Sequence, residues 1–195
     1  MEKFNLDMEK RYSYADYLKW SFDETVEIIK GIIFKMAPAP NRNHQEISGR
    51  LYLIFGNYFI ENPCNLYSAP FDVRLPRKKG ESADELIITV VQPDLCVICD
   101  NEKLDERGCI GAPDLIIEIL SPGNSKKEMK DKFNVYEESG VREYWIVFPV
   151  EKSVIIYSLN EEAKYIGSRL YTVDDNIKST IFPELVIELN YIFKD

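Results

Sequence analysis

Two acidic residues stand in apolar segments where a carboxylate is unusual. Glu118 interrupts the apolar run 114–120. Asp94 opens the apolar run 94–99, directly after Pro93. A carboxylate inside a buried strand carries a large desolvation cost unless it is paired or binds a metal. If the two strands are neighbours, both carboxylates reach one hard cation such as Mg²⁺. The alternative is that Asp94 caps a turn and that Glu118 pairs with a core Lys or Arg.

A lysine on the following helix is turned toward the same region. The sequence predicts a helix over 125–139, opened by a capping box of Ser125 and Glu128. At about 100° per residue, Lys132 lies beside the apolar stripe of this helix. Its ammonium therefore either reaches the carboxylate of the preceding strand or forms a surface pair with Glu128, one turn away.

The segments that position these residues alternate between strand and helix patterns. We expect a short helix over 13–20, a hairpin over 26–36, an amphipathic helix from about 43, a hairpin of 66–75 and 86–91, strands over 94–99, 114–120, 144–148 and 154–159, and β structure over 164–173 and 185–189. At 195 residues the chain predicts a single domain spanning 1–195. Arg77, Lys78 and Lys79 form the basic tip of the second hairpin, where they either touch a DNA backbone or are solvated.

Composition excludes some chemistries and opposes one partner. His44 is the single histidine, so zinc sites that need two or three imidazoles are excluded. The formal net charge is −9, from 24 Lys and Arg against 33 Asp and Glu. Such a balance repels nucleic acid unless local basic residues and metal ions offset it.

The cysteines and the apolar segments indicate the compartment. Cys96 and Cys99 form one CxxC without a second, and residues three apart in a strand point to opposite faces. We expect them to be buried, reduced, structural thiols. The N-terminus lacks the apolar stretch of a signal peptide, and no run of about 18 apolar residues occurs. We therefore expect a cytoplasmic protein with no membrane partner.

Short motifs follow one another along the chain in a specific order and spacing. They are VEIIKGIIFKM at 26–36 with Pro38, His44-Gln45, APFDV at 69–73, QPDL at 92–95, GAPDL at 111–115 with EILSP at 118–122, and GVREYW at 140–145. In these motifs the sequence resembles the Uma-two family, a bacterial group of restriction-endonuclease-like proteins in the PD-(D/E)xK nuclease superfamily. The resemblance covers roughly residues 12–190.

The resemblance implies an α/β (α+β) fold with a restriction-endonuclease-like core, a mixed β-sheet flanked by helices. It makes Asp94 the acid of the PD element and Glu118 the acid of the (D/E)xK element, with the backbone carbonyl of Ile119 as a further metal ligand. Leu120 stands where the superfamily usually carries its lysine. The family draws this lysine from the following helix, and the aligned position is Lys132.

Three further residues match motif positions, and two depart from them. The resemblance gives Glu27, His44 and Gln92 supporting roles near the site. For His44 the alternative is a packed or capping histidine at a helix start. Lys30 and Glu128 stand where relatives carry Asp.

The function implied is that of a metal-dependent endonuclease that hydrolyses phosphodiester bonds in DNA. Asp94 and Glu118 would hold one or two Mg²⁺ (or Mn²⁺) ions, and Lys132 would orient the attacking water and stabilise the phosphate. DNA is the expected partner, along with a second copy of the chain in a homo-oligomer, namely a dimer. One alternative is a weak or inactive nuclease-fold protein with a binding or regulatory role, which the acidic balance favours. Another is a hydrolase of small phosphoesters.

Overall fold

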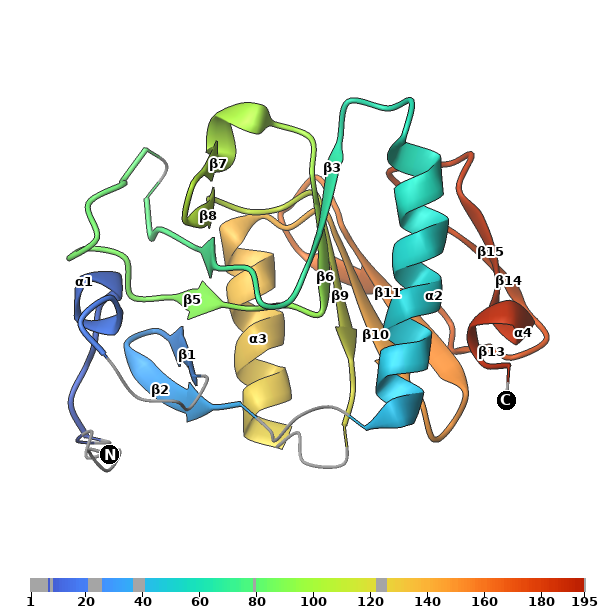
Figure 1. Cartoon of the computed structure of the whole chain (residues 1–195), viewed down its shortest axis with the longest axis horizontal. Coiled ribbons are helices and arrows are strands. Elements are labelled where there is room, and N and C mark those ends of the chain that lie inside the picture. Colours follow the sequence, from blue (N-terminus) through green and yellow to red (C-terminus); the bar gives the residue numbers. More distant parts are fainter. Residues whose placement is uncertain are drawn as a thin grey trace.

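Two mixed β-sheets with a helix between them form the body of the protein (Figure 1). The computed structural model describes residues 7, 9–20, 26–36, 41–78, 80–121 and 126–194. These residues place the chain in the α+β class, as predicted. The helices are α1 (Tyr14–Tyr17), α2 (Arg42–Phe59), the 3-10 turn η1 (Asn101–Lys103), α3 (Lys126–Ser139) and α4 (Leu189–Ile192).

The larger sheet carries both acidic segments on interior strands. In the described residues it has seven strands, and β9 and β10 are its parallel pair. Strands β6 and β9 are antiparallel neighbours. The order is β12 (Tyr165–Gly167), β11 (Ser153–Leu159), β10 (Glu143–Phe148), β9 (Leu115–Ile119), β6 (Leu95–Ile98) and β3 (Asn65–Ser68), with β13 (Tyr171–Thr172) paired to β11.

The smaller sheet faces α3 from the other side. It has six strands among the described residues, including one parallel pair, β4 and β8. The order is β2 (Ile32–Lys35), β1 (Val26–Ile29), β5 (Val90–Val91), β4 (Val73–Arg74), β8 (Gly108–Ile110) and β7 (Leu104–Asp105). A separate hairpin of β14 (Asn176–Lys178) and β15 (Val186–Glu188) precedes α4.

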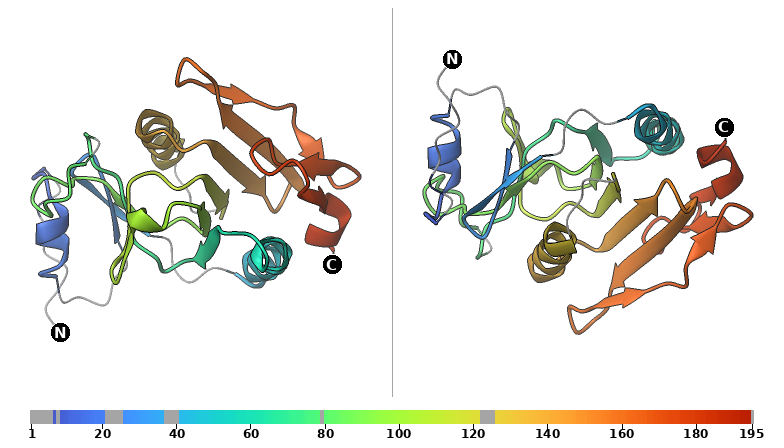
Figure 2. Two further views of the ribbon diagram at one scale, coloured as in Figure 1. Left: turned by 90° about the horizontal axis from the view of Figure 1, so that it is seen from above. Right: turned by 90° about the horizontal axis from the view of Figure 1, so that it is seen from below.

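The alternation of side chains along β9 divides the core into two layers. Ile117 and Ile119 pack with Leu51 of α2, whereas Ile116 packs with Tyr136 of α3. This is the period of two that a strand requires when both of its faces are covered. Figure 2 shows α2 and α3 on opposite sides of the larger sheet. Glu118 has the parity of Ile116, so its side chain lies on the α3 face.

Most elements form where their patterns predict them. Ser13 caps α1, and the reciprocal bonds of Ser13 with Asp16 complete a capping box. The 26–36 hairpin turns at Lys30 and Gly31, which have φ of 52° and 82°. Helix α3 runs to Ser139 as expected, while Ser125 of its predicted capping box lies outside the described residues.

The segment 66–75 is not one strand. Its first part is β3 in the larger sheet, and its last part is β4 in the smaller sheet. Pro70 lies between them and has no N–H to donate to a ladder, so it ends the pairing of β3 with β6. The predicted pairing with the segment 86–91 is present but short, since only Val73–Arg74 and Val90–Val91 pair.

The prediction that Cys99 is a reduced thiol was wrong. Cys64 and Cys99 form a disulfide, whereas Cys96 and Cys109 are free and buried. The β3–β6 register pairs Asn65 with Ile98, so the next residues outward, Cys64 and Cys99, stand opposite each other. Within the described ranges, no helix has both the length and the apolar character needed to cross a bilayer.

Candidate active site

Asp94 and Glu118 lie side by side on one face of the larger sheet. The antiparallel register pairs Leu95 with Ile117, and one step outward it places Asp94 opposite Glu118. Opposed residues of an antiparallel pair point to the same face. The Asp94 carboxylate is also fixed to the neighbouring strand, because the Ile119 N–H donates to its Oδ2 over 2.7 Å.

The Lys132 ammonium joins two of the acids. Its Nζ lies 3.0 Å from Glu118 Oε1 and 3.0 Å from Glu27 Oε2. Glu27, Glu118 and Lys132 are 2, 8 and 6% exposed. A buried charge of this kind is stable only when it is paired. The structure therefore turns Lys132 inward and excludes the surface pair with Glu128.

Tyr136 is a member of the site that the sequence pattern did not single out. It follows Lys132 by one turn of α3, and its hydroxyl donates to Glu118 Oε1 over 2.6 Å. Tyr136 belongs to the apolar stripe of α3, and its ring packs in the core. The signal available was the i, i+4 spacing of Tyr136 and Lys132, which puts both on one face.

The electrostatics of the cluster follow from its burial. Burial raises the pKa of Glu118 to about 7; the Lys132 charge opposes this rise, and the Glu27 and Asp94 charges add to it. Burial alone would lower the pKa of Lys132, but the Glu118 and Glu27 carboxylates outweigh it and raise that pKa above its usual 10.5. Lys132 is therefore a permanent cation at neutral pH.

Glu27 also links the site to the smaller sheet. Its Oε1 accepts the backbone N–H of Gln92 over 2.8 Å, while its Oε2 faces Lys132. The Gln92 side chain turns elsewhere, since its Nε2 donates to Asp72 Oδ1 over 2.8 Å. Of the predicted supporting residues, Glu27 thus touches the cluster with its side chain and Gln92 with its backbone.

His44 contacts the other end of the acidic pair. It lies in the first turn of α2, where its N–H donates to the side chain of the N-cap residue Asn41. Its Nε2 lies 3.2 Å from Asp94 Oδ1, and its buried Nδ1 has no partner among the described residues. Burial lowers the pKa of His44, but the hydrogen bond and charge of Asp94 outweigh it and raise that pKa. His44 thus packs in the first turn of a helix and contacts Asp94, and its supporting role in the site stays a prediction.

The Ile119 carbonyl faces the same side of the strand as Asp94. Leu120 N donates to Val147 O, so the neighbours of Ile119 make the bonds to β10. In a strand, the N–H and C=O of one residue point to the same side. Because the Ile119 N–H reaches Asp94, its carbonyl is directed to that side as well. Leu120 packs among apolar residues and supplies no charge.

The oxygen donors of Asp94 and Glu118 are of the kind that a hard cation prefers. Among the described residues, no group of three or more His, Cys, Asp or Glu side chains is placed to hold a metal. Mg²⁺ needs only one or two carboxylates, since waters and substrate phosphates complete its shell. Asp94 and Glu118 meet that requirement. The arrangement can therefore take a partly hydrated Mg²⁺ or Mn²⁺.

Comparisons with known proteins agree with this architecture. Residues 14–190 match the family model Uma2, which is described as "Putative restriction endonuclease". An uncharacterised protein of Synechocystis is 23% identical over 159 residues, which cover 80% of this chain and 78% of that protein. A crystal structure described as a putative nuclease of DUF820 from Anabaena variabilis superposes with a TM-score of 0.73 at 20% identity. That match covers 93% of this chain and 97% of the other. The fold is therefore that of this nuclease-like structure, and the chain belongs to the Uma2 family.

Proposed function

We propose that this protein is a Mg²⁺- or Mn²⁺-dependent endonuclease that hydrolyses phosphodiester bonds in DNA. One observation carries the proposal. Asp94, directly before β6, stands opposite Glu118 of β9, and Lys132 of α3 lies 3.0 Å from Glu118. Two carboxylates beside one ammonium are the groups needed to hold a divalent cation next to a phosphate and to offset its charge.

In this proposal Asp94 and Glu118 hold the cation, with the Ile119 carbonyl as a further ligand. Lys132 and Tyr136 both donate to Glu118 Oε1, so Oε2 is the oxygen of that carboxylate left for a cation. When bound, the cation would lower the pKa of a coordinated water and neutralise charge on the phosphate.

Lys132 acts as the fixed cation of the site. Two of its three N–H groups are engaged by Glu27 and Glu118, which leaves one donor for a phosphate oxygen or the attacking water. Because Glu27 of β1 and Glu118 of β9 both pair with the ammonium, its position is fixed before substrate binds. Such preorganised charge stabilises a transition state at low reorganisation cost. Glu27 is the residue that positions Lys132.

The net charge of −9 of the protein repels the proposed DNA substrate, so local positive charge must offset this repulsion. Helices α2 and α3 begin at the end of the sheet where β9 ends (Figure 1), and their first turns carry exposed cations. They are Arg42 on α2 and Lys126, Lys127 and Lys130 on α3. Basic side chains around an acidic site are what a polyanionic substrate requires, and a bound metal adds to them.

Calorimetry and cleavage together test the proposal. We expect Mn²⁺ to bind the wild type and to lose most of its affinity in Asp94→Asn and Glu118→Gln, with plasmid cleavage lost in the same variants. Glu106→Gln, at an exposed acid on a turn, is the matched control and should bind and cleave as the wild type does. Circular dichroism establishes that each variant folds.

Two outcomes would overturn the proposal. Absence of Mn²⁺ binding in the wild type would remove the metal site and would support a binding or regulatory role, which the acidic surface favours. Metal binding with hydrolysis of bis-p-nitrophenyl phosphate but not of plasmid DNA would instead identify a small-phosphoester hydrolase.

A further inference from the structure

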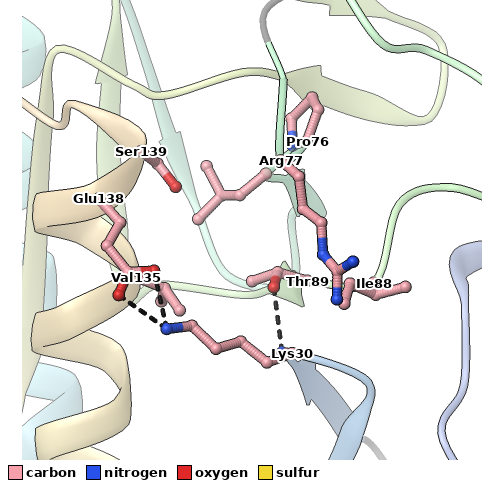
Figure 3. A pocket seen from close by; sticks show the side chains of 9 residues that line it. Lys30, Pro76, Arg77, Ile88, Thr89, Val135, Glu138 and Ser139 are labelled. Carbon is pink, nitrogen blue, oxygen red and sulfur yellow. Dashed lines mark hydrogen bonds and ion pairs between the residues drawn. The ribbon is translucent and has the colours of Figure 1, made fainter.

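A pocket lies at the C-terminal end of α3, beside the turn of the β1–β2 hairpin. It is a pocket of about 330 Å³ between the turn of the β1–β2 hairpin, the ends of β4 and β5, and the last turns of α3 (Figure 3). Its volume is at the lower end of the range for small-molecule sites. Lys132 and Tyr136 do not line it, so it is separate from the candidate active site. It brings together Lys30 and Arg77 of the basic loop, to which the proposed nuclease chemistry gives no role; Lys79 of that loop lies outside the described residues.

The polar groups of the pocket are mainly donors. Arg77 is exposed and forms no ion pair within the part of the chain that the structure describes. Thr89 is buried, and its Oγ1 accepts the Lys30 N–H over 3.1 Å, which leaves its hydroxyl hydrogen free to donate. Ser139 adds a second hydroxyl. Figure 3 shows Thr89 between the Arg77 guanidinium and the Lys30 ammonium.

The one acid of the pocket is already neutralised. Lys30 Nζ lies 2.7 Å from Glu138 Oε2 and 2.8 Å from Oε1. Both side chains are about half exposed, and exposed pairs of this kind are weak, so the ammonium can also serve an incoming anion. With Lys30 and Glu138 cancelling, Arg77 leaves the pocket with a positive charge in a chain whose net charge is −9.

We propose that this pocket binds the phosphoryl group of an organic phosphate. The planar guanidinium of Arg77 pairs with two phosphate oxygens, and the Thr89 and Ser139 hydroxyls donate to the third. The organic body lies against the apolar wall formed by Leu75 and Pro76 after β4, Ile88 before β5 and Val135 of α3. The phosphate has two conceivable sources, a free small molecule and a DNA backbone, which share this chemistry.

Occupancy of the pocket bears on the candidate active site. A ligand held by Thr89, directly before β5, and by Ser139 links the smaller sheet to α3. The smaller sheet also carries Glu27 and α3 carries Lys132, and these two side chains pair at 3.0 Å. Binding should therefore tighten the docking of α3 and raise the stability of the folded chain.

Calorimetry with inorganic phosphate and phenyl phosphate, without metal, tests the proposal independently of any nuclease activity. We expect saturable binding, tighter for phenyl phosphate because of the apolar wall. Arg77→Gln and Ser139→Ala should each weaken it, the first by roughly tenfold. Lys78→Gln is the matched control, since Lys78 is an exposed cation of the same loop that does not line the pocket.

The outcomes separate the possibilities. If Lys78→Gln and Arg77→Gln weaken phosphate binding equally, the attraction is non-specific and the proposed binding in the pocket is wrong. Absence of binding at roughly 10 mM phosphate would overturn the proposal as well. Equal affinity for both probes would overturn the organic-phosphate assignment. Displacement of phenyl phosphate by a short DNA duplex would identify the backbone as the source, and failure to displace it would identify a free small molecule.

Discussion

The Lys132 ammonium lies 3.0 Å from Glu118 Oε1, although the two residues belong to different elements. Glu118 is on β9 and Lys132 is on α3. Leu120, two residues after Glu118, is where a strand-borne lysine would stand, and it packs in the core instead. Lys132 of α3 thus supplies the positive charge that Leu120, after β9, does not supply.

Removing this cation should destabilise the fold strongly. We expect Lys132→Met to lower the free energy of unfolding by about 3–5 kcal/mol at pH 8, because it leaves Glu27 and Glu118 buried without a counter-charge. The loss should shrink at pH 5.5, where Glu118 takes up a proton. Urea unfolding at both pH values measures the effect. Lys130→Met, at an exposed position of the same helix, is the control; equal losses in both variants would contradict the pairing.

The raised pKa of Glu118 predicts a pH dependence of stability. The ordinary value is 4.5 and the folded value is about 7, so the folded chain holds this proton more tightly than the unfolded chain does. The resulting stabilisation is complete below pH 4.5 and is lost as the pH rises through 7. We expect the stability difference between wild type and Glu118→Gln to change by about 3 kcal/mol across this window in metal-free protein. A constant difference from pH 4.5 to 7.5 would show that Glu118 titrates normally.

Tyr136 should orient Glu118 rather than merely fill space. We expect Tyr136→Phe to cost about 1.5–3 kcal/mol, the range for a hydrogen bond to a charged group, and to weaken Mn²⁺ binding by calorimetry. Tyr157→Phe is the matched control, because Tyr157 packs against Phe133 in the same aromatic cluster. Loss of stability in Tyr136→Phe with unchanged Mn²⁺ affinity would limit Tyr136 to a packing role.

The Cys64–Cys99 disulfide should contribute measurably to stability. It closes a loop with a sequence separation of 35, and a crosslink of this length is worth about 2–4 kcal/mol. Dithiothreitol should therefore lower the urea midpoint of the wild type. The double variant Cys64→Ser, Cys99→Ser should start at the lower midpoint and not respond. An unchanged midpoint on reduction of the wild type would contradict this contribution.

Repeats of apolar residues predicted most helices and strands, because an element that buries one face needs apolar residues at the repeat of that face. The acid in an otherwise apolar β9 and the inward flank of α3 made Glu118 and Lys132 candidate partners, with a surface pair of Lys132 and Glu128 as the alternative. The repeats of a strand and a helix left that choice open, and the family motif favoured the site. Glu27 became a candidate through its family motif, since a single acid near a hairpin has no pattern of its own.

Features that depend on a distant partner were not predictable in this way. The register between β3 and β6 decides that Cys99 meets Cys64, and local spacing carries no information about it. The split of 66–75 depends on which sheet each half joins. Tyr136 was hidden because an aromatic ring in an apolar stripe packs the same way whether or not its hydroxyl has a partner.

The distribution of the cluster along the chain makes any chemistry at this site conditional on complete folding. Glu27 enters on β1, Glu118 on β9 and Lys132 on α3, so no short fragment contains them together. A chain emerging from the ribosome presents its acids first and receives its cation only when α3 has been made and docked. Nascent or truncated chains that lack α3 therefore lack the complete cluster, and the order of synthesis fixes when the site can first form.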